Sequence, residues 1–417
     1  MGHVSYPRDL PPSASLEGAK RDSDIQGLRA RTRRVLERSV PMVTDREVFR
    51  AALGALRERR GAGRIASFAS IASLWAPFQT LTRLTLELDD RVHPEYRSAP
   101  IDSPIFIVAN PRSGTTLLHR LMSEDEENFA SFTLGETIFP SVSIQSLFTR
   151  LGKLDDRFLG GALDKAARAF DARVFGSRWE DVHRLGLFEA EEDETFFTYS
   201  LQSPTTMLLV PFPDAIAPLV QLDHLSRDKR ELMMDYYEGT IRRLIHRKGH
   251  DKRYLDKNVF HTHRIRTIAE RFPDARFVYM VRHPFEALPS FLNMFYEAWN
   301  THSPDIAKDS PEIRQLLRVG YENYRYALEL SRALPADRMS IRRYEDLVAD
   351  PKVFVENLYD WLGQGMSDAF CSRLETATSA QRLYERPYGH KLAHFGIDEA
   401  EVRVELAEVF EAFGYSD

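Results

Sequence analysis

IFIVANPRSGTT, residues 105–116, is the most informative stretch of this sequence. Residues 105–109 are a short apolar run rich in β-branched side chains, residues 110–114 form a polar turn, and a helical pattern covers residues 115–122. This is the order strand, tight turn, helix. The N–H groups of such a turn and of the first helical turn form a cradle for an anion. We therefore predict an anion-binding loop made of Arg112, Ser113, Gly114, Thr115 and Thr116.

The side chains of this loop suit a phosphate-like group but not a Walker A site. Gly114 lets the backbone approach a ligand closely, the neighbouring hydroxyls can donate hydrogen bonds, and Arg112 adds a charged fork. A Walker A loop needs a lysine directly after its last glycine, and Thr115 stands there instead. A nucleotide kinase using ATP and Mg²⁺, one alternative function, would therefore lack its usual lysine.

The same alternation of strand and helix continues along the chain. Strand patterns cover residues 253–256, 276–281 and 339–343, and helical patterns follow them near residues 262–272, 284–299 and 353–362. Alternation at this spacing predicts right-handed crossovers and a parallel sheet. The predicted fold class is α/β: a P-loop-like, doubly wound parallel sheet flanked by helices, with a helical N-terminal addition. We expect the helical region at residues 1–99 and the α/β domain at residues 100–417.

Composition limits the function classes. The chain has 417 residues, 56 Lys+Arg against 62 Asp+Glu, a net charge of −6 and 43% hydrophobic residues. This is ordinary globular composition, and the acidic balance gives no support for nucleic-acid binding. The single cysteine, Cys371, rules out an intrachain disulfide or a cysteine-rich zinc site. We expect a cytoplasmic protein without a metal, and the oligomeric state stays open.

Residues 65–82, IASFASIASLWAPFQTLT, are the one long uncharged stretch. Six hydroxyl or amide side chains and Pro77 make them a poor transmembrane span. A buried or amphipathic helix is the simple interpretation. The alternative is an interfacial helix that admits an apolar substrate, which would give the protein a peripheral membrane contact.

PRSGTT at residues 111–116, after an apolar strand, resembles the 5′-phosphosulfate loop of sulfotransferases. The resemblance is to the bacterial sulfotransferase family and to the tyrosylprotein sulfotransferases, which carry arginine in this loop. It implies a P-loop-like α/β fold and metal-free transfer of a sulfonate group from 3′-phosphoadenosine 5′-phosphosulfate (PAPS). These families hold the 3′-phosphate of PAPS with an arginine at a strand end and a serine eight residues later. Arg282 and Ser290 stand at that spacing after the run FVYMV.

Two further stretches resemble cofactor-facing parts of the family. Residues 343–347, RYEDL, are similar to the segment whose tyrosine approaches the adenosine, which implies this role for Tyr344; packing in the core is the alternative. Residues 385–397 resemble the last cofactor-facing loop of bacterial members, although Tyr and His stand in the opposite order. Arg386 and Lys391 are the candidates there for the 3′-phosphate, and an exposed basic loop would look the same.

The catalytic residues implied by the resemblance are a lysine and a base. Lys257, in LDKNVFH, stands where the family has a lysine that stabilises charge on the leaving oxygen. Glu136, in LGETIFP, resembles the glutamate base of tyrosylprotein and related bacterial enzymes. His261 is the competing base, but the histidine of cytosolic members lies two residues after the lysine, where this chain has Val259. We favour Glu136.

The acceptor is the least specified part of the prediction. The acidic run EAEEDE at residues 189–194 is interpreted as the solvated start of a helix, with a carboxylate of the acceptor site as the alternative. Residues 205–220 are apolar and either line an acceptor pocket or pack in the core. We expect a small, partly apolar or lipid-like alcohol or amine as the acceptor. A non-catalytic nucleotide-binding scaffold is the remaining alternative to an enzyme.

Overall fold

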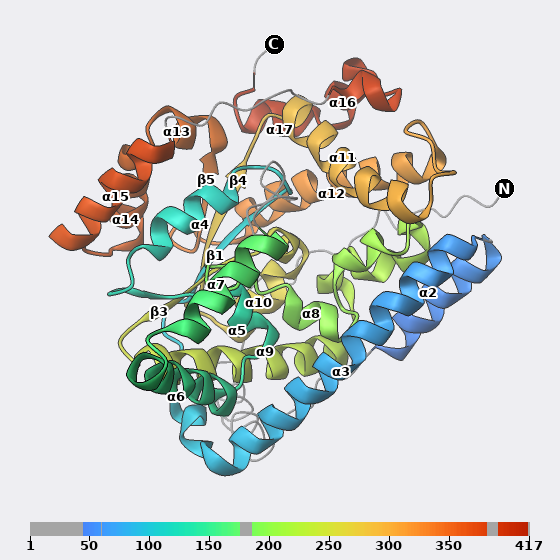
Figure 1. Cartoon of the computed structure of the whole chain (residues 1–417). Coiled ribbons are helices and arrows are strands. Elements are labelled where there is room, and N and C mark those ends of the chain that lie inside the picture. The colour runs from blue at the N-terminus through green and yellow to red at the C-terminus, as the bar shows by residue number, and fades with distance from the viewer. Residues whose placement is uncertain (1–44, 60, 176–185, 382–390, 416–417) are drawn as a thin grey trace.

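A five-stranded parallel sheet forms the centre of the protein, in a computed structural model that describes residues 45–59, 61–175, 186–381 and 391–415. The strands are β1 (Ile105–Ala109), β2 (Phe129–Ala130), β3 (Arg253–Lys257), β4 (Arg276–Val281) and β5 (Met339–Arg343). Their order is β2-β3-β1-β4-β5, and every neighbouring pair is parallel. Because β1 is central and the chain winds outward to both sides, the predicted doubly wound sheet is confirmed (Figure 1).

Helices cover both faces of the sheet (Figure 1). In chain order they are α2 (Arg46–Glu58), α3 (Ala62–Val92), α4 (Thr115–Ser123), α5 (Leu134–Ile138), α6 (Val142–Phe158), α7 (Ala162–Phe175), α8 (Thr195–Tyr199), α9 (Arg227–Lys248), α10 (Ile265–Arg271), α11 (Pro284–His302), α12 (Pro311–Ala333), α13 (Tyr344–Ala349), α14 (Pro351–Leu362), α15 (Asp368–Gln381), α16 (Glu399–Glu405) and α17 (Ala407–Ala412). Short 3-10 turns at residues 94–98, 204–208, 213–219, 222–224, 259–264 and 392–395 complete the described structure.

The alternation of side chains along the strands divides the core into two layers. Phe106 of β1 and Phe277 of β4 face one layer, where their rings stack with centroids 5.6 Å apart, and α9, α11 and α12 close it. Ile107 and Val278 face the other layer, which α4, α14 and α15 close. The central strands β1 and β4 are buried on both faces and read as nearly continuous apolar runs, as expected of a covered parallel sheet, whereas the edge strand β5 is mostly half-buried.

The N-terminal helices pack onto the α/β body. Ala52 and Leu56 of α2 are buried in the same core as Phe106. α3 is held by Asp89, which accepts hydrogen bonds from Ser141 Oγ (2.9 Å) and Arg243 Nε (3.1 Å). Residues 65–82 lie within α3, and Pro77 does not end this helix. Among the helices of the described ranges, none combines the length and apolar character needed to cross a bilayer.

Candidate functional site

The predicted anion loop joins the end of β1 to the start of α4. Its backbone turns left-handed twice, at Arg112 (φ 74°) and at Gly114 (φ 80°). Ser113 is buried and donates its hydroxyl to the carbonyl of Asn110 (2.8 Å), which closes the turn. Turns that alternate in hand point successive N–H groups into one concavity, and the N-terminus of α4 adds its own unpaired donors. The local backbone is therefore that of an anion-binding nest.

Four of the predicted site residues come together around this loop: Arg112, Ser290, Arg282 and Tyr344. Arg112 Nε donates to Ser290 Oγ (3.0 Å), and Arg282 Nη1 donates to the carbonyl of Arg112 (3.0 Å). The Arg282 guanidinium lies 4.7 Å from the centre of the Tyr344 ring, which lies against Gly114. The three segments follow β1, β4 and β5, whose carboxyl ends meet at one edge of the sheet.

Lys257 connects the loop to the acidic run. It is the last residue of β3, is 1% exposed, and donates from Nζ to Thr116 Oγ1 (3.2 Å). Its Nζ also pairs with the carboxylate of Glu192. Glu192 was not among the predicted site residues, because nothing in EAEEDE distinguishes one carboxylate from the next. Only the position of Lys257 shows that Glu192 is the one next to the loop.

Three of the five carboxylates of the acidic run, those of Glu191, Asp193 and Glu194, are buried, so its interpretation as a solvated segment is wrong for these residues, although Glu189 is exposed. Asp193 and Glu194 are 0% and 5% exposed, and the Asn258 amide donates to both of them (2.7 and 2.6 Å). Arg264 binds Glu194 with two nitrogens (2.6 and 3.0 Å). Carboxylates are tolerated inside a protein when cations and amide donors compensate them in this way. The run does lead into a helix, since α8 begins at Thr195.

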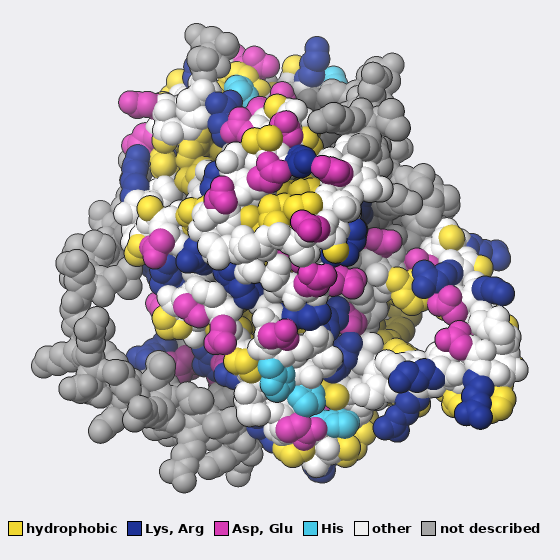
Figure 2. Space-filling view, turned by 90° about the vertical axis from the view of Figure 1, so that its left-hand side faces the viewer, with side chains coloured by type: hydrophobic (Ala, Val, Ile, Leu, Met, Phe, Trp, Pro, Cys, Tyr) yellow, Lys and Arg dark blue, Asp and Glu magenta, His cyan; other side chains and the backbone are white. Residues whose placement is uncertain are grey.

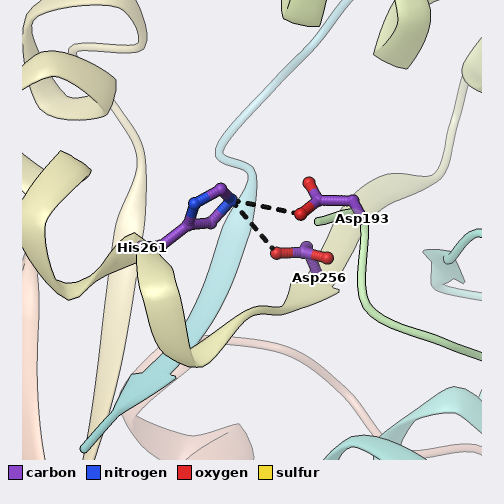
Figure 3. Close-up of side chains that lie close together, drawn as sticks. All are labelled: Asp193, Asp256 and His261. Atoms are coloured by element: carbon purple, nitrogen blue, oxygen red, sulfur yellow. Dashed lines mark ion pairs between the residues drawn. The ribbon is translucent and has the colours of Figure 1, made fainter. Parts of the chain in front are cut away.

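The imidazole of His261 faces two carboxylates (Figure 3). Its Nε2 is 3.4 Å from an oxygen of Asp193 and 3.4 Å from an oxygen of Asp256. Its Nδ1 is 3.1 Å from Nη1 of Arg264. A guanidinium can only donate, so Nδ1 accepts, which assigns the ring proton to Nε2. His261 is 0% exposed and both nitrogens are engaged, so its contacts favour a positioning role over the predicted base role.

The same geometry argues against a metal at this cluster. Ligand atoms of Asp193, Asp256 and His261 lie within 4.8 Å of one another, as in a metal site. To bind a cation, His261 would need a lone pair on Nε2 and hence a proton on Nδ1. That proton would face a donor of Arg264. The donor set therefore fits a hydrogen-bonded network better than a metal centre.

The pKa values of the two carboxylates beside His261 are shifted in opposite directions. Burial raises the pKa of Asp256 well above its usual value, and the neighbouring Asp193 charge raises it further. Burial also acts on Asp193, but His261 and hydrogen bonds from Tyr237 and Asn258 outweigh it, and the pKa of Asp193 lies below its usual value. These opposite shifts favour the ionised form of Asp193 and the protonated form of Asp256.

Glu136, the favoured base, has both carboxylate oxygens engaged. It caps the N-terminus of α5 by accepting from the Thr133 N–H (2.9 Å), and it pairs with Arg247 (2.5 Å) and Lys248 (3.0 Å) of α9. Burial raises its pKa, but the two cations and the hydrogen bonds outweigh burial, so the pKa lies below its usual value. Glu136 is thus an ionised carboxylate with structural partners.

Two other predicted regions add little to the site. Arg386 lies outside the described residues, and Lys391 is exposed beside the 3-10 turn at residues 392–395. The apolar stretch near residues 205–220 packs into the core, with Val210 and Phe212 buried. Core packing, one of its two interpretations, therefore accounts for its composition.

Comparison with known proteins gives the family. The model of the Sulfotransferase family matches residues 104–368. Two curated relatives, the omega-hydroxy-beta-dihydromenaquinone-9 sulfotransferases Stf3 of Mycobacterium bovis and Mycobacterium tuberculosis, are each 27% identical over 279 residues. The match spans 66% of this chain and 66% of each relative, just under two thirds of their length.

Two solved structures share the fold. Sulfotransferase STF1 from M. tuberculosis H37Rv has a TM-score of 0.64 at 19% identity, covering 92% of this chain and 98% of its own. Sulfotransferase STF9 from Mycobacterium avium has a TM-score of 0.64 at 18% identity, covering 79% and 81%. The family match begins one residue before β1 and ends at the first residue of α15, and so includes the whole sheet and the anion loop. By this match, which covers more than half of its length, the chain belongs to the sulfotransferase family.

Proposed function

We propose that this sulfotransferase takes its sulfonate group from PAPS and transfers it to a hydroxyl or amine of a small, partly apolar acceptor. The observation that carries the proposal is the contact between Arg112, Ser290 and Arg282 beside the anion loop. These groups offer two sets of cationic and hydroxyl donors, one for each end of a nucleotide with two phosphate groups. The Tyr344 ring lies between them and offers a face for stacking.

The donor would bind in two parts. The loop N–H groups, with Ser113, Thr115 and Thr116, would hold the 5′-phosphosulfate at the N-terminus of α4. Arg282 and Ser290 would hold the 3′-phosphate, and Arg386 remains a predicted third contact. Arg282 now pairs with Glu286 (2.6 Å), whose carboxylate is 58% exposed. We expect a phosphate to displace that carboxylate.

The chemistry needs a cation and a base. The acceptor oxygen or nitrogen attacks sulfur, the bond from sulfur to the bridging oxygen breaks, and the electron pair leaves with 3′-phosphoadenosine 5′-phosphate. Lys257, which donates a hydrogen bond to Thr116, would stabilise that developing charge. The acceptor proton goes to a carboxylate positioned within hydrogen-bond reach.

The contacts favour Glu192 for this base. Its side chain is 21% exposed and pairs with Lys257, whereas both oxygens of Glu136 are held by the α5 cap and by α9. Glu136 would then act by positioning α5. His261, which is fully buried and faces Asp193, would position the acidic run.

A lipid-like acceptor is the class best supported. The curated relatives are named for an omega-hydroxy-dihydromenaquinone, an apolar molecule with a hydroxyl group. A partly apolar alcohol is also what the sequence predicts. An acceptor of this kind is compatible with a cytoplasmic protein that contacts the membrane from one side, as proposed for residues 65–82.

Thermal unfolding with 3′-phosphoadenosine 5′-phosphate, compared with ATP and Mg²⁺, tests the donor class. Ligand at 100 times its dissociation constant adds about 2.7 kcal/mol, or about 3 °C for a chain of this length. We expect this shift with the bisphosphate, its loss in Arg282→Ala, and its retention in Arg227→Ala, a control at an exposed ion pair on α9. Stabilisation by ATP and Mg²⁺ alone would contradict the proposal. Formation of sulfonated product from an isoprenoid alcohol then tests the acceptor.

A further inference from the structure

α6 and α7 form a hairpin whose apolar side chains face solvent. On α6, Leu147, Leu151, Leu154 and Phe158 are between 43% and 69% exposed. Their spacing of three and four residues places them along one line of the helix. On α7, Leu163 and Phe170 are 55% and 58% exposed, again seven residues apart on one face. Exposed apolar stripes on two adjacent helices mark an interaction surface rather than scattered surface residues.

Basic side chains border these stripes. Arg150, Lys153 and Arg157 lie on α6 at positions three and four apart, beside the apolar line. Together the two helices carry six basic residues and four acidic ones, and one acid, Asp155, is buried where it caps α7. The hairpin is therefore net positive, whereas the whole chain has a net charge of −6. Figure 2 shows dark blue and yellow side chains side by side on the projecting part at its right-hand edge, where this hairpin lies.

The apolar surface continues from α6 onto α3. The ring centroids of Phe78 on α3 and Phe139 after α5 are 6.0 Å apart, and those of Phe139 and Phe148 on α6 are 6.4 Å apart. Leu74 and Leu81 of α3, on either side of Phe78, are 64% and 44% exposed. Part of the stretch 65–82 thus joins the stripes of the hairpin in one continuous surface.

The hairpin also contacts the segment that leads to the candidate site. The Arg168 guanidinium of α7 lies 5.0 Å from the centre of the Phe188 ring, and Asp171 accepts from the Leu187 N–H (2.8 Å). Phe188 is itself exposed, and four residues later Glu192 pairs with Lys257. The hairpin therefore contacts residues that lie only four to five positions before the carboxylate that pairs with Lys257.

We propose that this surface docks the protein onto an anionic lipid bilayer. The lipid-docking surface is defined by the exposed apolar residues of α3, α6 and α7, namely Leu74, Phe78, Leu81, Leu147, Phe148, Leu151, Leu154, Phe158, Leu163 and Phe170. Aliphatic and phenylalanine side chains bordered by Arg and Lys are the pattern of helices that lie in the membrane interface. The positive charge of the hairpin, opposite in sign to that of the chain, is complementary to anionic headgroups. Docking itself does not depend on the proposed function, but delivery of a lipid acceptor to Glu192 rests on it.

Co-sedimentation with large unilamellar vesicles tests the docking. We expect the full chain to bind phosphatidylglycerol-containing vesicles more tightly than pure phosphatidylcholine vesicles. Leu151→Glu and Phe158→Glu should each reduce the partition coefficient at least tenfold. Lys153→Gln should reduce it about fivefold on anionic vesicles. Thr149→Glu, exposed on the same helix but off the stripe, is the control matched in charge to the stripe variants, and it should reduce the partition coefficient no more than Lys153→Gln does.

Several results would overturn the proposal. If Leu151→Glu and Phe158→Glu had the same partition coefficient as the wild type, the stripe would not touch lipid. Equal binding to both vesicle types would show that the docking surface does not recognise anionic headgroups. A dimer in analytical ultracentrifugation that Leu151→Glu converts to monomer, without any vesicle binding, would make a second copy of this chain the occupant.

Failure of docking can be told from failure of the proposed function. Because the substituted side chains are exposed, each variant should keep the melting temperature of the wild type and its shift with 3′-phosphoadenosine 5′-phosphate. Loss of vesicle binding with that shift intact is the expected result for the stripe variants. A wild-type protein that binds vesicles but not the bisphosphate would leave docking standing and refute the donor.

Discussion

Gly114→Ala tests whether the anion loop depends on the approach of Tyr344. A Cβ on Gly114 would lie 2.4 Å from Cδ2 of the Tyr344 ring, whereas ordinary contacts begin at 3.4 Å, so the ring would have to move by about 1 Å. The residue also has φ 80°, which an L-residue adopts only with strain. The variant therefore combines a backbone cost with a packing cost.

The expected loss of stability follows from these two terms. A left-handed conformation costs about 1–2 kcal/mol and overpacking about 1–3 kcal/mol, offset by about 0.4–1 kcal/mol from the less flexible unfolded chain. The net loss is about 3 kcal/mol, or about 3 °C in Tm for this length. Binding of the bisphosphate should fall as well, because the displaced ring contacts Arg282.

A double-mutant cycle with Tyr344→Ala separates the two costs. Without the ring, Gly114→Ala should cost only the backbone term, about 1–2 kcal/mol, so the two substitutions should be coupled by about 1–3 kcal/mol. Gly54→Ala is the control, since nothing lies within 4 Å of its added Cβ and it should stabilise α2 by about 0.5–1 kcal/mol. Denaturant unfolding measures all four proteins. The same cost for Gly114→Ala with and without the ring would refute the steric reasoning.

Three further predictions concern buried charges. The pKa of Glu136 is lowered in the folded protein, so its ionised form stabilises the fold above about pH 4.3, and this stabilisation is lost as pH falls through the folded pKa. Glu136→Gln should therefore lower the free energy of unfolding at pH 7 by about 1–3 kcal/mol. Urea unfolding across pH should show that the difference between this variant and the wild type narrows below about pH 4. Asp193→Asn should destabilise by about 2–5 kcal/mol, since the lowered pKa of Asp193 favours its ionised form. The raised pKa of Asp256 favours its protonated form, which Asp256→Asn mimics, so this variant should be neutral or stabilising; equal losses in both variants would contradict the two directions. Lys257→Ala should lower the rate of sulfonate transfer about 10²–10³-fold in single turnover, while Lys252→Ala, an exposed control, should not.

The strands were predictable where each one carries its own apolar pattern. β1, β4 and β5 have the bounds that the sequence predicts, and β3 is one residue longer. β2, only two residues long, was missed because two residues show no alternation. It is nevertheless an edge strand of the sheet, held through its pairing with β3.

The site was predictable where it depends on strand ends, and not where it depends on distant partners. Arg112 and Arg282 meet because a parallel sheet brings the ends of β1 and β4 to one edge. The burial of Glu194 depends on Arg264, 70 residues further along, and no local pattern shows that pairing. The cations of α9 that hold Glu136 are equally remote, 111 residues away in the case of Arg247.

The bond from Arg282 to the Arg112 carbonyl has a thermodynamic consequence for ligand choice. Since Arg112 also binds Ser290, the two phosphate-binding regions share one residue and cannot be ordered independently. A ligand that orders one region reduces the entropy lost when the other is filled, which is positive coupling. We therefore expect a nucleotide with phosphates at both ends to bind more tightly than the separate affinities of its halves imply. Selectivity against nucleotides with a single phosphorylated end would then arise from linkage between the two regions, without a steric barrier in either.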